Sequence, residues 1–77
     1  MRYAVVIEKA LANYSAYVPD LPGCVATGAT EAEVVDLMAE AIELHLQGTI
    51  EDGEPLPEST VKAVEIAVRE PQRSQAA

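Results

Sequence analysis

The stretch YSAYVPDLPGCVATGATEAEVVDLMAEAIELHLQG, residues 14–48, decides the fold of this 77-residue chain. Its first residues, 14–18, predict a short strand, which Pro19 ends because proline donates no ladder hydrogen bond. The sequence PDLPG then predicts a fixed loop, with two prolines setting φ and Gly23 supplying backbone freedom. Residues 24–27 predict a further short strand, so the first half of the stretch places two strands around a defined loop.

The second half of the stretch predicts an amphipathic helix. Thr30 is a good N-cap, and Glu33 completes a capping box in which each side chain satisfies a backbone N–H. Gly53 followed by Pro55 predicts the end of the helix. Apolar residues recur at helical spacing and predict one buried stripe, made of Val34, Leu37, Met38, Ala41 and Ile42, with Leu44 at its edge.

Strands are predicted on both sides of this stretch. Residues 2–9 are apolar on both alternating faces, which is typical of a central strand covered twice. The Val-rich residues 60–68 predict a fourth strand, and residues 69–77 a polar tail. The order strand, strand, strand, helix, strand indicates an α+β domain over residues 1–68, with one helix on a small sheet. Because one helix covers only one face, we expect a homodimer or higher oligomer.

Charge is unevenly distributed along the chain. The formal net charge is −8, from 13 acidic and 5 basic residues. No Lys or Arg occurs between residues 10 and 61, so the middle of the chain is expected to present a negative surface. Such a surface repels nucleic acid and suits a basic protein partner. The alternative is that the charge only keeps the domain soluble.

The cysteine count, the apolar runs and the N-terminal residues indicate the cellular compartment of the protein. One cysteine excludes an intrachain disulfide and a metal finger built from several cysteines. No apolar run reaches the roughly 18 residues of a membrane helix. The N-terminal residues lack the apolar core and the cleavage site of a signal peptide. We therefore expect a cytoplasmic protein that does not bind membranes.

The residues able to do chemistry do not form a catalytic set. His45 is the only histidine, and its place in the apolar stripe favours a packed side chain over a general base. Cys24 lies among acidic residues, which oppose thiolate formation, so a small buried apolar role is favoured. Nucleotide-binding, zinc-protease and hydrolase motifs are absent. We expect no catalytic residue, no cofactor and no enzymatic activity.

The main alternative to an exposed acidic surface is a divalent metal site built from the carboxylates. It would need Glu8 and Glu65 to converge with Glu40 or Glu43, since Mg²⁺ takes oxygen ligands from several elements. The helical pair falls on the polar face, away from the sheet. A solvated face is the better interpretation, and we expect no metal.

Four pieces of sequence, in this order, resemble the HicB family of antitoxins from toxin–antitoxin systems. They are YSAYVPDLPGC (14–24), GAT with Glu33 (28–33), EAI (40–42) and EDGEPLP (51–57). The resemblance spans about residues 1–68. It implies a partial ribonuclease-H-like domain of three strands, a helix and a strand, the order that the pattern also predicts.

The resemblance also implies a function. A HicB-like chain is an antitoxin that neutralises a small basic toxin, HicA, by direct binding, and that toxin cleaves messenger RNA. Many family members carry a C-terminal DNA-binding domain that represses their own operon, and this chain looks like a short form without one. A divalent-metal nuclease remnant and a DNA-binding autorepressor are the alternatives. Arg69 and Arg73 alone are a poor electrostatic footprint for nucleic acid.

The expected partner-binding surface is acidic. Asp36, Glu40 and Glu43 share one face of the predicted helix, and no Lys or Arg close in sequence neutralises them. Asp20 and Tyr17 are expected to extend this surface from the loop side. The rival is that this face is only solvated and that a partner uses the uncovered face of the sheet. The sequence leaves both open.

Overall fold

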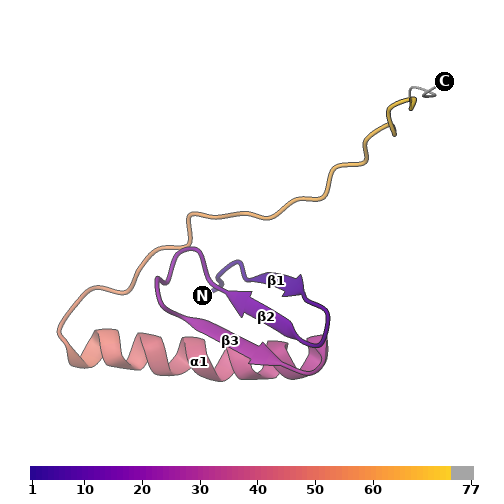
Figure 1. Cartoon of the computed structure of the whole chain (residues 1–77). Coiled ribbons are helices and arrows are strands. Elements are labelled where there is room, and N and C mark those ends of the chain that lie inside the picture. Colours follow the sequence, from indigo (N-terminus) through magenta and orange to yellow (C-terminus); the bar gives the residue numbers. More distant parts are fainter. Residues whose placement is uncertain (74–77) are drawn as a thin grey trace.

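The structure, a computed structural model, describes residues 1–73. Three strands, β1 (Val6–Lys9), β2 (Tyr14–Tyr17) and β3 (Val25–Gly28), precede one helix, α1 (Glu31–Glu51). The strands form an antiparallel sheet in the order β1-β2-β3, and α1 lies across one of its faces (Figure 1). The expected α+β class with one helix on a small sheet is confirmed.

The core forms where α1 meets the sheet. Ile7, Ala16 and Ala26 are paired across the three strands and lie on the face turned towards the helix. On the helix, Val34 is 0% exposed and Met38 is 2% exposed, and both pack against this row. The apolar stripe of the helix and the inward-facing residues of the strands thus pack together in one small core.

The loop between β2 and β3 closes this core. The Leu21 amide donates to the Val18 carbonyl at 3.1 Å, and the Cys24 amide donates to the Leu21 carbonyl at 3.0 Å. Gly23 has φ +83°, the left-handed region that glycine adopts without strain. The tight turn inserts the Leu21 side chain into the core, where it is fully buried.

Both predicted ends of the helix are confirmed. The Thr30 hydroxyl accepts a hydrogen bond from the Glu33 amide at 3.1 Å. At the other end Asp52 is the C-cap, and Gly53 follows with φ +73°. The stripe is narrower than predicted, because Leu37 lies at its border and is 38% exposed.

The predicted fourth strand, at residues 60–68, is not formed. From residue 54 to residue 73 the chain has no assigned secondary structure, and residues 58–73 are exposed. Figure 1 shows this segment leaving the sheet as a long arm. The radius of gyration is 17.2 Å, against about 11 Å for a compact domain of this length. A strand needs a neighbour for its ladder, and none within residues 1–73 pairs with the arm.

The missing strand changes the position of β1. Its apolar faces predict a central strand, but β1 pairs with β2 alone and is an edge strand. The predicted polar tail falls partly on residues 74–77, which lie outside the described residues, while residues 69–73 are exposed. No helix in the described part of the chain has the length and hydropathy to cross a membrane.

We predict that Leu21→Ala lowers the free energy of unfolding by about 2–5 kcal/mol, because it empties a fully buried site in a small core. Leu11→Ala is the matched control, since Leu11 is fully exposed, and it should change stability by less than about 0.5 kcal/mol. Urea unfolding followed by circular dichroism measures both. Equal effects of the two changes would contradict the placement of the loop.

Candidate partner-binding surfaces

The outer face of α1 is acidic. Asp36, Glu40 and Glu43 are all exposed there, spaced so that they share one face of the helix. Within residues 1–73 none of them forms an ion pair, and the one salt bridge found there joins Arg73 to Glu70. The structure therefore brings together the three helical residues predicted from the sequence and leaves their charges unneutralised by pairing.

Asp20 lies apart from that face and is engaged within the chain. Its carboxylate accepts hydrogen bonds from the Thr60 amide at 2.9 Å, from the Thr60 hydroxyl and from the Val61 amide at 3.2 Å. The hydrogen bonds from Thr60 lower the pKa of Asp20. The Tyr3 hydroxyl donates to the carbonyl of Pro57, three residues before Thr60. These contacts fix the start of the arm to the β2–β3 loop and to the residues before β1.

Tyr17 belongs to the face of the sheet that α1 leaves open. Val6, Tyr17 and Val25 are cross-strand partners and form an apolar row on that face. Tyr17 is 42% exposed and Val25 is 64% exposed. The adjacent row is polar, consisting of Glu8, Ser15 and Thr27. The open face therefore offers one apolar band that a partner could cover.

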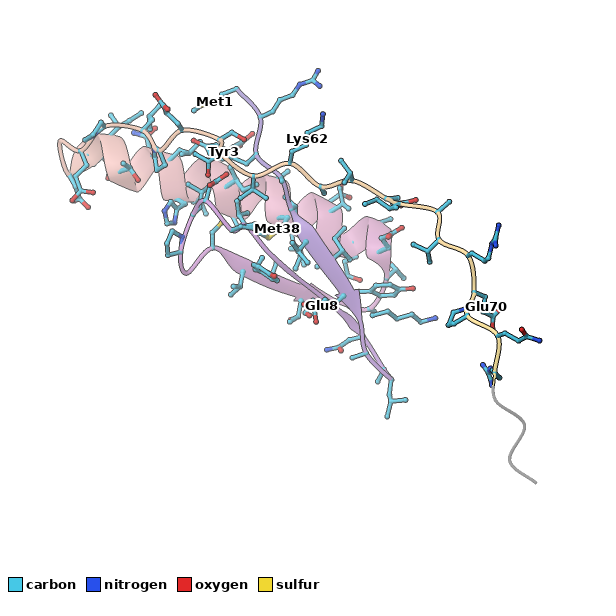
Figure 2. The ribbon with its side chains drawn as sticks, turned by 90° about the horizontal axis from the view of Figure 1, so that it is seen from above. Met1, Tyr3, Glu8, Met38, Lys62 and Glu70 are labelled. Carbon is cyan, nitrogen blue, oxygen red and sulfur yellow. The ribbon has the colours of Figure 1, made fainter. Side chains whose placement is uncertain are left out.

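A third surface lies between β1 and α1. The helix packs mainly against β3 and less against β2, so the β1 side is left hollow. The resulting apolar groove has a volume of about 210 Å³ and is lined by Val5, Ile7, Val35, Met38, Ala39 and Ile42. Figure 2 shows Met38 between the helix and the strands, and Lys62 on the arm, which crosses in front of the helix in this view.

Cys24 and His45, the two side chains considered for catalysis, lie in buried and half-buried positions. Cys24 is 4% exposed, and burial raises the pKa of its thiol, which confirms the small buried role predicted for it. His45 is half-buried on α1, and its carbonyl accepts a hydrogen bond from the Thr49 hydroxyl at 2.9 Å. Among the described residues, no three His, Cys, Asp or Glu side chains are grouped to hold a metal ion.

Sequence reasoning missed the apolar row and the groove. Both depend on strand register, which sets Tyr17 opposite Val6 and Val25. The anchoring role of Asp20 was also missed, because Thr60 lies 40 residues further along the chain. The signal available was the pair of hydroxyl residues in the segment EST, which can donate to a carboxylate.

The chain is similar to one described protein family and to individual proteins from a phage and from a bacterium. Residues 3–76 match a family described as HicB-like antitoxins of bacterial toxin–antitoxin systems. An uncharacterised 14.9 kDa protein of Haemophilus phage HP1 is 44% identical over 59 residues, which cover 77% of this chain and 44% of that protein. A UPF0150 protein of Synechocystis is 38% identical over 69 residues, covering 86% of this chain and 87% of the relative. The chain thus spans less than half of the phage protein.

A solved structure is similar as well. It is a HicA3 and HicB3 toxin–antitoxin complex, and the matched chain has 30% sequence identity with a TM-score of 0.65. The match covers 78% of this chain and 70% of that one. At this level of identity the likeness extends beyond the architecture to the sequence.

We predict that Thr60→Ala raises the pKa of Asp20 towards its ordinary value of 3.8, because the carboxylate loses its hydroxyl donor. The folded-state pKa is depressed, so the stabilising contact is present above the unfolded value and is lost as pH falls through the folded value. An NMR titration that follows the Asp20 carboxyl carbon measures this pKa in the wild type and in Thr60→Ala. Ser59→Ala is the control and should leave the pKa of Asp20 unchanged. An identical Asp20 pKa in the wild type and in Thr60→Ala would contradict the anchor.

Proposed function

This chain belongs to the HicB-like antitoxins of bacterial toxin–antitoxin systems, and we propose that it neutralises a small basic, HicA-like, RNA-cleaving toxin by binding it directly. The observation that carries the proposal is the family match, which runs from residue 3 to residue 76. The similar solved structure supports it, since that structure is a complex of HicB3 with HicA3.

The charge of the folded part supports the same partner. Residues 1–59 contain 11 acidic and two basic residues. A toxin that cleaves RNA needs Lys and Arg side chains against the phosphates of its substrate. An acidic protein surface is attracted by the same basic groups, so it can compete with RNA for them. The same charge disfavours DNA binding by this chain alone.

Two of the surfaces are candidates for the toxin contact, and they would contribute differently. The acidic face formed by Asp36, Glu40 and Glu43 would attract a basic toxin over a distance and speed association. The apolar row through Tyr17 on the open sheet face would instead provide desolvated contact that slows dissociation. We place the first docking contact on the acidic face, because its three charges have no ion-pair partner within residues 1–73.

Inhibition by binding requires no reaction chemistry from this chain. The exposed positions of Glu40 and Glu43 on the outer side of α1 keep them away from Glu8 on the sheet. This separation argues against a convergent set of carboxylates for a metal-dependent nuclease. We therefore propose that the chain is not an enzyme.

Co-expression with a short basic open reading frame, where one lies beside its gene, tests the proposal. We expect the two proteins to co-purify and the antitoxin to restore growth that the toxin alone arrests. The purified chain by itself should leave RNA intact with Mg²⁺ or Mn²⁺. Failure to co-purify, or metal-dependent RNA cleavage that disappears on Glu8→Gln, would contradict it.

The acidic face is tested by changing its charge without changing its size. We predict that Asp36→Asn, Glu40→Gln and Glu43→Gln together slow toxin association on the order of tenfold at low salt and flatten its salt dependence. Single changes should do little, because exposed pairs contribute about 0–1 kcal/mol each. Stopped-flow or surface-based kinetics give the association rate.

A matched variant removes the same net charge elsewhere. Glu51→Gln, Glu54→Gln and Glu58→Gln together also remove three exposed carboxylates, but from the end of α1 and the connector. This control should slow association much less than the first triple variant. If the first variant binds at the wild-type rate at low salt, the acidic-face proposal is wrong and the open sheet face becomes the contact site.

A further inference from the structure

A line of apolar and small residues runs along one side of α1, at the edge of the core. Leu37, Ala41, Leu44 and Gly48, here called the flank stripe, follow one another at spacings of four, three and four residues, which place them on one side of the helix. Leu44 is 73% exposed, and Ala41 and Gly48 are half-buried. Figure 1 shows α1 as an outer layer of the molecule, with no other described segment beyond it. The flank stripe is therefore largely open in the described part of the chain.

Gly48 is a residue that the fold of this chain does not require. It lies inside α1, where glycine is less favourable than alanine because its backbone loses more freedom on folding. Its φ is not positive, in contrast to those of Gly23 and Gly53. A Cβ atom at Gly48 would meet no atom within 4 Å beyond the turns of its own helix. A glycine with these properties instead permits the close approach of a partner's backbone.

The spacing along the flank stripe fits a partner helix. Steps of four and three residues form the kind of seam into which a second helix packs its side chains. The large side chains of Leu37 and Leu44 alternate with the small ones of Ala41 and Gly48. Side chains of a partner helix can therefore fit between the two leucines while the two backbones come close.

The charge of α1 selects the kind of helix that can pack there. The sequence of α1 contains six acidic residues and no Lys or Arg. Glu33 and Glu40 lie next to the flank stripe, and Glu40 also belongs to the acidic face. Two copies of α1 packed along this stripe would bring like charges together, which is unfavourable. A helix with Lys or Arg beside its apolar residues would instead meet opposite charges, so charge favours a basic partner over a second copy.

We propose that the flank stripe is the desolvated part of the toxin contact, and that its occupant is an amphipathic helix of the toxin with basic residues beside its apolar face. This inference rests on the proposed function, and it places the apolar contact on α1 and not on the open sheet face. The acidic face attracts the basic toxin, and the adjacent flank stripe excludes water once the toxin has docked. Gly48 lets the two helices approach closely.

The dissociation rate of the short basic protein that co-purifies with this chain tests the contribution of Leu44. We expect Leu44→Ala to speed dissociation about tenfold or more, because an apolar side chain at the centre of a contact acts mainly on dissociation. Ile50→Ala is the matched control, since Ile50 is a 55% exposed apolar residue on a different side of α1. The control should change the rate less than about twofold. Far-UV circular dichroism verifies that both variants keep the helix.

Gly48→Leu separates a partner contact from a structural role. Leucine forms helices more readily than glycine, so the midpoint of urea unfolding of the chain alone should rise. The same change should weaken toxin binding about tenfold or more, because the new side chain blocks the approach of the partner helix. Ala32→Leu adds bulk at an exposed position on another side of α1 and should leave binding unchanged. A purely structural role of Gly48 would move stability and affinity in the same direction.

Isotope-filtered NMR of the methyl-labelled chain with the unlabelled toxin locates the contact directly. We expect intermolecular contacts from the Leu37 and Leu44 methyl groups. Contacts from Val25 instead, or wild-type binding by both Leu44→Ala and Gly48→Leu, would overturn the inference and leave the proposed function standing. Sedimentation of the chain alone that changes with Leu44→Ala would identify a second copy as the occupant and would overturn it as well. If no basic protein co-purifies, the proposed function and this inference are both contradicted.

Discussion

The packing of Val34 and Met38 against the inner face of the sheet is the contact on which the fold depends. It joins the helix to the row Ile7, Ala16 and Ala26, and the loop carrying Leu21 closes it. One helix is too narrow to cover three strands evenly, and it lies nearer to β3 than to β1. The open sheet face, the groove beside β1 and the outer face of α1 all follow from this one-sided packing.

Local chemistry made much of this fold predictable. Thr30 begins the helix and Gly53 follows its end, because a side-chain hydroxyl and a left-handed glycine act within a few residues of themselves. Pro19 and Gly23 likewise define the loop without help from distant residues. Elements whose signals are local were therefore predicted with their correct order and type.

What depends on distant contacts was not predictable in the same way. The segment at residues 60–68 has a strand pattern, but a pattern does not supply the neighbouring strand, and the single chain leaves it unpaired. Leu37 fits the helical spacing yet lies at the border of the stripe and is 38% exposed. Of the expected partner-binding residues, Asp36, Glu40 and Glu43 share a face, while Asp20 instead holds the arm.

The proposed function needs surfaces and not a catalytic centre. An antitoxin that acts by direct binding must occupy its toxin in proportion to the amount added, since each bound toxin is removed from the RNA-cleaving pool. The most direct measurement is therefore the RNA-cleavage rate of a fixed amount of the cognate toxin, titrated with the full-length chain. The rate should fall linearly and reach zero at a stoichiometric ratio. Cleavage that continues while the toxin is demonstrably bound, or that never responds to the chain, would contradict neutralisation by binding.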